Sequence, residues 1–364
     1  MSRLFSFLLP DLRGGGAERV NLLLMHELLE RGYSVDLVLL KKDGALLKQI
    51  SSHVRIIDLQ AGRVRNAFRP LMRYLQRQDP SALLVSMWPL TTIAVLSAKA
   101  ARFHGRVVLV EHSALSRSPQ NKGLSGFALR ASMRWVNPLA NSVLGVSSGV
   151  LDDLHGLGLP KDKGGVIYNP VAISSESRLP SAWLEHPWVR CPKQFRLLAV
   201  GALKPAKDYP TMLSAIKRLV DSGLHLSLLI LGTGPLQGEL EELCRSFGLE
   251  KHVHFGGFMP DPGPFYRAAG LFVLSSAWEG FGNVIVEALA AGTPVVSTDC
   301  RSGPAEILDK GRYGRLVPVA DGRALAMAIG DTLSANHDVE ALQSRANDFS
   351  TKKIGQAYLQ VLVE

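Results

Sequence analysis

The sequence predicts an α/β protein made of two doubly wound domains, and three observations lead to this prediction. Short apolar runs alternate with helical segments along most of the 364 residues. Many of these runs end in glycine-rich or polar turns, which is where parallel sheets bind their ligands. The alternation stops over residues 172–195, which hold three prolines and no convincing element. Since the chain is long enough for two cores, we expect one domain on each side of this segment.

The expected strands are nearly continuous apolar runs, as is usual when helices cover both faces of a parallel sheet. The first domain would contain Leu4–Leu9, Val35–Leu40, Val54–Leu59, Ala82–Ser86, Val107–Val110 and Ser142–Val146. The second would contain Arg196–Val200, Leu226–Leu231, Leu271–Leu274 and Val295–Thr298. The apolar segment 82–101 is long enough for a membrane span, but Pro89 divides it. We therefore interpret it as a strand, a loop and a helix over Thr91–Arg102.

The formal charge of +9 is concentrated in the first half of the chain. Residues 1–173 hold 22 Lys and Arg against 12 Asp and Glu, whereas the remaining residues hold 19 against 20. Four arginines recur every four residues and would share one helical face: Arg65, Arg69, Arg73 and Arg77. A second segment mixes cations with large apolar residues: Arg117, Lys122, Arg130 and Arg134 with Leu124, Phe127, Leu129, Met133 and Trp135. This mixture suits an amphipathic helix on an anionic membrane, although an ordinary solvated helix face is the alternative.

The cysteines and the N-terminus indicate a protein of the reducing cytosol. Cys191, Cys244 and Cys300 are odd in number and widely spaced, which argues against a disulfide framework or a zinc site and favours buried thiols. The first apolar stretch is too short for a signal peptide and ends at Pro10-Asp11, so it is better interpreted as a strand.

Several turns that follow expected strands carry residues that suit an anionic or hydroxylated ligand. Gly14-Gly15-Gly16-Ala17-Glu18-Arg19 follows the first strand and opens a helix that runs to about Arg31. His112 ends another strand and could donate a hydrogen bond, although a lone histidine is more often structural. Residues 201–208 bring Lys204 and Lys207, both placed to meet phosphate. The turn Gly232-Thr233-Gly234-Pro235 has a purely structural alternative.

The strongest motif is Glu279-Gly280-Phe281-Gly282-Asn283-Val284-Ile285-Val286-Glu287, which follows the strand Leu271–Leu274 and opens a helix to about Ala291. Its glycines free the backbone N–H groups of Phe281, Gly282 and Asn283 to hold a diphosphate at a helix start. Glu287 lies in an otherwise apolar helix, so its carboxylate needs a partner. A vicinal diol such as that of a ribose is one such partner, and a structural ion pair is the alternative.

The ordered set of these motifs resembles glycosyltransferase family 4, whose members are bacterial retaining enzymes of the GT-B fold. The resemblance runs from Gly14 to about Val319. Besides Glu279-x7-Glu287 it includes Gly-Gly-Ala-Glu-Arg-Val (15–20), Gly-Val-Ser-Ser (145–148), Val-Ile-Tyr-Asn-Pro-Val (166–171), Lys-Asp-Tyr-Pro-Thr-Met-Leu (207–213), Val-His-Phe-Gly-Gly-Phe (253–258), Ala-Gly-Thr-Pro-Val-Val-Ser-Thr (291–298) and Ser-Gly-Pro-Ala-Glu-Ile-Leu (302–308).

The resemblance implies two Rossmann-like domains that face each other across a cleft. The first, residues 1–172, would bind the acceptor, and the second, residues 195–349, would bind a nucleotide-sugar. Residues 173–194 would link them, and a terminal helix over about 350–364 would pack back on the first domain.

The resemblance also implies a role for each site residue. Glu279 would contact the donor sugar at the reacting face, and His112 would help to position that sugar. Glu287 would bind the donor ribose and Lys207, with Lys204, the diphosphate. Further donor contacts would come from Gly15, Gly16, Gly257, Phe258, Gly280, Phe281, Gly282 and Asn283, with Gly257 and Phe258 beside the nucleobase. One position departs from the family pattern, because Ala202 stands where the family usually has arginine, and one guanidinium contact to phosphate is therefore missing.

The predicted reaction needs no cofactor and no metal, since the sequence has no Asp-x-Asp motif. A UDP-sugar is the favoured donor, with GDP-mannose as the alternative, and a glycan or lipid-linked molecule is the expected acceptor in surface-polysaccharide or lipopolysaccharide assembly. The expected place is the cytoplasm, at the inner face of an anionic membrane. Three alternatives remain. A sugar-nucleotide epimerase has the same fold, a dehydrogenase would need a different glycine spacing, and a nucleic-acid binder would need interleaved aromatic residues.

Overall fold

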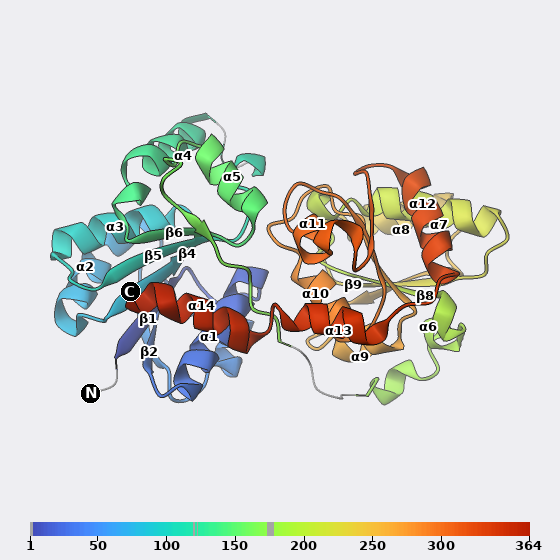
Figure 1. Ribbon diagram of the computed structural model, residues 1–364, viewed down its shortest axis with the longest axis horizontal. Coiled ribbons are helices and arrows are strands. Elements are labelled where there is room, and N and C mark those ends of the chain that lie inside the picture. Colours follow the sequence, from blue (N-terminus) through green and yellow to red (C-terminus); the bar gives the residue numbers. More distant parts are fainter. Residues whose placement is uncertain (1–2, 119–120, 122, 173–177) are drawn as a thin grey trace. The chain divides into compact units, whose positions relative to one another are not determined.

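Two parallel sheets organise the computed structural model, which describes residues 3–118, 121, 123–172 and 178–364 (Figure 1). The described residues up to Val171, together with Phe349–Glu364, form one unit, called unit 1 below. The described residues of Ala172–Asp348 form the other, called unit 2. Both are doubly wound Rossmann-like units, so the predicted α/β class is confirmed.

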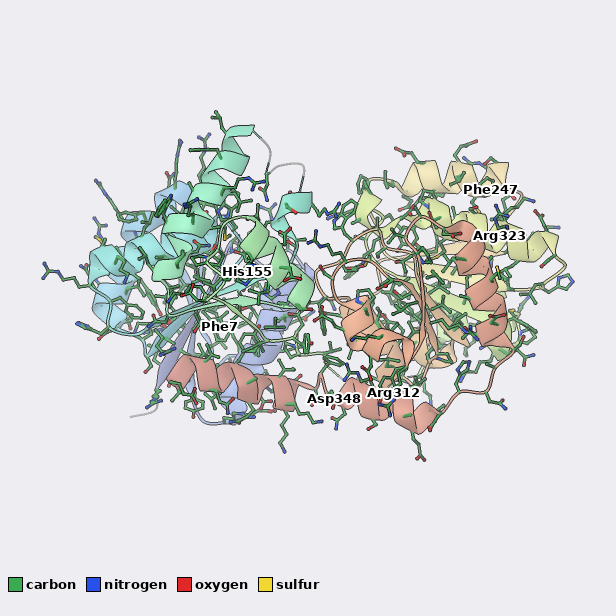
Figure 2. The ribbon with its side chains drawn as sticks, turned by 45° about the horizontal axis from the view of Figure 1, so that its top comes forward. Phe7, His155, Phe247, Arg312, Arg323 and Asp348 are labelled. Carbon is green, nitrogen blue, oxygen red and sulfur yellow. The ribbon has the colours of Figure 1, made fainter. Side chains whose placement is uncertain are left out.

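Unit 1 contains a seven-stranded parallel sheet with the order β3-β2-β1-β4-β5-β6-β7. The strands are β1 (Leu4–Leu9), β2 (Ser34–Leu39), β3 (Arg55–Asp58), β4 (Ala82–Ser86), β5 (Arg106–Glu111), β6 (Ser142–Gly145) and β7 (Gly165–Val166). The helices are α1 (Gly16–Glu30), α2 (Phe68–Gln78), α3 (Leu90–Ala101), α4 (Gly123–Trp135), α5 (Ser148–Gly156) and α14 (Thr351–Val363). The central strands are buried on both faces, and Phe7 of β1 lies among them with no exposed surface (Figure 2).

The C-terminal helix α14 lies beside α1 in unit 1 (Figure 1). The Arg31 guanidinium donates to the backbone oxygen of Lys352 at 3.2 Å, and Arg106 Nε donates to that of Val361 at 2.9 Å. A Cβ at Gly355 would lie 2.5 Å from Glu27 Cγ, so the two helices approach closely at this glycine.

Unit 2 contains a six-stranded parallel sheet with the order β10-β9-β8-β11-β12-β13. The strands are β8 (Arg196–Val200), β9 (Ser227–Leu231), β10 (Val253–Gly257), β11 (Leu271–Leu274), β12 (Val295–Thr298) and β13 (Arg315–Val317). The helices are α6 (Pro187–Arg190), α7 (Tyr209–Asp221), α8 (Gln237–Ser246), α9 (Gly263–Ala268), α10 (Asn283–Ala290), α11 (Pro304–Ile307), α12 (Gly322–Leu333) and α13 (Val339–Asn347). Aliphatic side chains of β8, β9 and β11 form its core with those of α7 and α12.

The prediction that residues 172–195 hold no regular element is wrong for the described part of that segment. Residues 178–195 form α6 and two short 3-10 helices, Ser181–Trp183 and Lys193–Phe195. Trp188 explains why they are ordered, since it is fully buried and its indole N–H donates to the Leu197 oxygen at 2.8 Å. Pro187, which argued against a helix, occupies the first turn of α6, where proline is tolerated.

The two basic segments are helical, but they differ in what they expose. Arg65, Arg69, Arg73 and Arg77 are all exposed, at and before α2. In the second segment Leu129 and Met133 are buried in the core, whereas Leu124, Phe127 and Trp135 are exposed. Arg117, Arg130 and Arg134 are exposed, and Lys122 lies outside the described residues.

Segment 82–101 forms the predicted strand and helix, β4 and α3, in place of a span. Across the described residues, every helix is too short or too polar to cross a membrane. The three cysteines are free thiols, with Cys244 and Cys300 buried as expected and Cys191 half-buried.

Candidate active site

The loops that follow β8 and β9 interlock at one edge of the unit 2 sheet. A Cβ at Gly232 would lie 2.1 Å from the Gly201 oxygen, and a Cβ at Gly234 would lie 2.3 Å from the Leu203 oxygen. Gly232 also has a φ of +144°, so glycine is required there for two reasons. The Gly232-Thr233-Gly234 turn therefore packs directly against the backbone of the loop after β8, which carries Lys204 and Lys207.

Lys207 and Glu279 form an ion pair at this edge. Lys207 Nζ lies 2.6 Å from Glu279 Oε1, and their side chains are 18% and 12% exposed. The Ser276 hydroxyl donates to the same carboxylate oxygen at 2.5 Å, and the Ser275 hydroxyl donates to the Lys207 backbone oxygen at 2.7 Å. The carboxylate of Glu279 is thus held by a cation and a hydroxyl, each in a fixed position.

The loop from Glu279 leads into α10 through a glycine in the left-handed region. Gly282 is the N-cap of α10, with φ +98° and ψ 49°, and the preceding Phe281 is 2% exposed. The backbone of Gly303, with φ +93°, packs on Phe281 so closely that a Cβ would lie 1.7 Å from the Phe281 oxygen. The loop after β12 therefore holds the start of α10 in place.

Glu287 finds its partner in a residue that the motif does not contain. The Tyr266 hydroxyl of α9 donates to Glu287 Oε2 at 2.8 Å. Burial, and then the neighbouring Glu287 charge, raise the pKa of Tyr266 well above its ordinary value, so the phenol remains a donor. Glu287 is half-buried on α10.

The remaining predicted residues of unit 2 lie at or after the carboxyl ends of strands of the same sheet. Lys204 and Ala202 are exposed in the loop after β8. Gly257, with φ +68°, ends β10 and accepts a hydrogen bond from Gly232 N at 2.7 Å. The next residue, Phe258, leaves 60% of its surface exposed.

In unit 1 the glycine motif forms the start of α1 as predicted. Gly15 is the N-cap, in extended conformation, and Gly16 is the first helical residue. A Cβ at Gly15 would lie 2.4 Å from Glu18 Oε2, so this carboxylate folds back over the turn. Burial raises the pKa of Glu18 from its ordinary value.

His112 follows β5 and belongs to a polar chain that reaches α1. Its Nε2 lies 3.2 Å from Ser86 Oγ, which lies 3.0 Å from Asn21 Nδ2, and Asn21 in turn donates to the Ala17 oxygen at 2.8 Å. Burial lowers the pKa of His112 to about 4, although a hydrogen bond with Asn169 opposes this. The imidazole is therefore neutral at physiological pH, and Ser86 and Asn21 connect it to the backbone of Ala17 in the first turn of α1.

Glu111, next to His112, is buried with 1% exposure. It accepts hydrogen bonds from Trp88 N at 3.2 Å and from the Thr91 hydroxyl at 3.1 Å. Burial raises the pKa of Glu111 to about 7. The sequence pattern singled out His112 and not Glu111, and it also missed Ser276, Tyr266, Ser86 and Asn21, which contact the predicted residues or their partners.

Two family models match the chain. The model described as Glycosyltransferase Family 4 matches residues 14–175, and the model described as Glycosyl transferases group 1 matches residues 194–335. The chain belongs to glycosyltransferase family 4. Each structural unit thus corresponds largely to one of the two family models.

This family 4 chain is similar to curated proteins over part of their length. It is 35% identical to the lipopolysaccharide core biosynthesis glycosyltransferase LpsE of Rhizobium meliloti over 171 residues, which are 46% of this chain and 49% of the relative. It is 29% identical over 233 residues to an N-acetylgalactosaminyltransferase of Campylobacter jejuni that acts on a diphospho-undecaprenol-linked sugar, covering 62% of this chain and 61% of that one. The chain spans between 37% and 61% of the first such relatives.

Solved structures show that the GT-B fold extends over the whole family 4 chain. HepE from Anabaena in complex with UDP-glucose superposes with a TM-score of 0.81 and covers 99% of both chains at 22% identity. The outer-core galactosyltransferase WaaB superposes with a TM-score of 0.74, covering 98% of both chains at 19% identity.

Proposed function

We propose that the chain transfers a sugar from a nucleotide-sugar to a hydroxyl group of a glycan or lipid-linked acceptor, with retention of the anomeric configuration. The observation that carries the proposal is the set of groups around the start of α10. Lys207 comes from the loop after β8, whereas Glu279 and Gly282 come from the loop after β11 and the half-buried Glu287 from α10, all in unit 2. A nucleoside diphosphate needs such a combination of cation, helix N-terminus and diol acceptor.

The donor would lie with its diphosphate at the start of α10 and its ribose at Glu287. The Tyr266 hydroxyl donates to one carboxylate oxygen of Glu287, and this carboxylate would accept hydrogen bonds from the diol. Phe258 would stack beside the base next to Gly257. We favour a UDP-sugar, since HepE was solved with UDP-glucose, and GDP-mannose is the alternative.

In the reaction the bond between the anomeric carbon and the phosphate oxygen breaks, and the leaving diphosphate takes the electron pair. Lys207 and the amides at the start of α10 would stabilise this negative charge. The acceptor oxygen then bonds to the anomeric carbon on the same face and passes its proton to the leaving phosphate. Glu279, fixed by Lys207 and Ser276, would orient the sugar at that face, and neutral His112 would donate or accept a hydrogen bond at a sugar hydroxyl.

A lipid-linked acceptor requires the enzyme to work at a membrane, and the outer face of α4 supports this part of the proposal. Leu124, Phe127 and Trp135 are 91%, 74% and 67% exposed, and the Arg134 guanidinium lies 5.0 Å from the Trp135 ring centre. An exposed apolar face flanked by arginine suits the interface of an anionic bilayer, which would be the inner face of the cytoplasmic membrane.

The membrane part can be tested by co-sedimentation with liposomes of phosphatidylcholine and phosphatidylglycerol. We expect binding that weakens with salt and that falls when Leu124 and Phe127 are both changed to serine. The matched control is Met327→Ser in unit 2, since Met327 is 61% exposed and lies on α12. Equal binding by all three proteins would contradict the role of α4.

The transferase proposal is tested first by thermal unfolding with UDP, GDP and NAD. A ligand at about 100 times its dissociation constant stabilises by about 2.7 kcal/mol. We expect UDP or GDP to raise the melting temperature of the wild type and not that of Glu287→Ala. The control variant is Glu239→Ala, since Glu239 is an exposed residue of α8, and it should show the same rise as the wild type. A shift with NAD alone would favour a dehydrogenase. Turnover of the nucleotide-sugar without an added acceptor would favour an epimerase, and the anomeric configuration of the product by NMR decides retention.

A further inference from the structure

The loops that follow the strands of unit 2 hold few cations for a ligand as anionic as a diphosphate. They are residues 201–208, 232–236, 258–262, 275–282, 299–303 and 318–321, all within the described chain. Lysine or arginine occurs in them at three positions, Lys204, Lys207 and Arg301. The Lys207 ammonium is paired with Glu279 at 2.6 Å, so this pair adds no net charge. Lys204 and Arg301 are therefore the two cations of these loops that could add further positive charge beside Lys207.

Arg301 stands on the loop that packs directly on the start of α10. Two residues later, the backbone of Gly303 lies against the Phe281 oxygen, where a Cβ would come within 1.7 Å. At the beginning of the same loop, the Thr298 hydroxyl donates to the Ser276 oxygen at 2.6 Å. Both ends of the loop are thus tied to the chain segment that contains Glu279.

The neighbours of Arg301 point inward, which leaves the arginine directed outward. Cys300 and Ser302 are 2% and 3% exposed, whereas Arg301 is exposed. Burial raises the pKa of the Cys300 thiol to about 12, and the charges of Glu279 and Lys207 both act on it, so this loop lies close to the ion pair. Among the described residues, Arg301 takes part in no ion pair. The nearest acidic residue along the chain is Asp299, which is exposed.

We infer that Arg301 supplies the guanidinium that holds the donor diphosphate, from the β12 side of the site. On the β8 side, the exposed Ala202 has no group to offer, and Lys204 offers only a point charge. A guanidinium presents paired N–H donors that match two phosphate oxygens, and it carries its charge at any physiological pH. This inference rests on the proposed function, since it assigns a residue to the same nucleotide-sugar site.

The test measures binding of a nucleotide and of its nucleoside by calorimetry, using UDP and uridine, or GDP and guanosine if GDP is the nucleotide that stabilises the wild type. We expect Arg301→Ala to weaken nucleotide binding about tenfold to a hundredfold, as for a lost charge-assisted hydrogen-bond pair. Nucleoside binding should be unchanged, because it has no phosphate. Arg301→Lys should recover only part of the loss, and Arg323→Ala, an exposed arginine on α12 (Figure 2), should bind as the wild type.

Three results would overturn the inference. Arg301→Ala could bind the nucleotide as tightly as the wild type while Glu287→Ala does not, in which case the proposed function stands and Arg301 has no role. Equal weakening for nucleotide and nucleoside would mean that Arg301 supports the loop and does not contact phosphate. A wild type that binds neither UDP nor GDP would remove the proposed function together with the inference.

Discussion

Replacing Glu111 by glutamine should change how the stability of unit 1 depends on pH. The Glu111 carboxyl is 1% exposed, and its hydrogen-bond donors are the Trp88 backbone N–H and the Thr91 hydroxyl. Neither donor carries a charge that would compensate an ionised carboxylate. Burial therefore raises the pKa of Glu111 from 4.5 to about 7.

Between pH 4.5 and 7 the folded chain holds more protons at Glu111 than the unfolded chain does. The free energy of unfolding therefore falls as pH rises, by about 1.4 kcal/mol per pH unit and by about 3 kcal/mol in all. His112 acts in the opposite direction. Burial lowers its pKa from 6.5 to about 4, so the unfolded chain binds the extra proton and stability is lost as pH falls between these values. The contributions of Glu111 and His112 to the pH dependence of stability thus nearly cancel in the wild type.

Urea unfolding of the wild type and of Glu111→Gln at a series of pH values separates these contributions. At each pH, the free energy of unfolding of the wild type is subtracted from that of Glu111→Gln. This difference should grow by about 3 kcal/mol between low pH and a pH above 7. His112→Gln should give a difference of opposite slope over the lower part of the range. Parallel curves for Glu111→Gln and the wild type would show that Glu111 ionises normally in the folded protein and would refute the reasoning.

Three further variants test the packing of unit 2. Lys207→Met should cost about 2–4 kcal/mol in urea unfolding, because it leaves the mostly buried Glu279 carboxylate without its cation, and adding Glu279→Gln should recover part of this loss. A double variant less stable than Lys207→Met would contradict this. Gly303→Ala should not fold natively, since its Cβ would lie 1.7 Å from the Phe281 oxygen, and a wild-type melting temperature would count against the described loop. Asp208→Ala removes the N-cap of α7 and should cost about 1 kcal/mol, or about 2–4 °C in melting temperature, whereas Asp208→Asn should cost less.

The central strands were predictable because parallel strands covered on both faces must be apolar throughout. Leu4–Leu9 and Leu271–Leu274 occupy their predicted bounds in β1 and β11. The strands that were not predicted, β7, β10 and β13, all lie at sheet edges. An edge strand has one neighbour and is partly exposed, so it needs no long apolar run, and β7 has only two residues.

The candidate site was predictable where one loop carries its residues and unpredictable where distant segments meet. Glu279 and Glu287 belong to one motif, and their loop and helix positions follow from it. The contact of Tyr266 with Glu287, and that of Ser86 with His112, bring together residues that are 21 and 26 positions apart. No local pattern specifies such pairs, because they depend on which helix packs beside which strand.

The pairing of Val171 with Phe349 has a consequence for how the two units are connected along the chain. Val171 N donates to the Phe349 oxygen at 2.9 Å, so the chain leaves unit 1 and re-enters it at adjacent points. Unit 2 is therefore a single continuous insertion in the chain of unit 1, and the two residues that flank it are neighbours in space. Such a domain can be removed and the flanking residues joined by a short linker without displacing the rest of unit 1. A chain that joins Val171 to Phe349 through a few glycines and serines should fold as unit 1 alone, with α14 still in place. The half expected to bind the acceptor and the half expected to bind the donor would then be obtained as separate proteins, each open to titration with its own ligand.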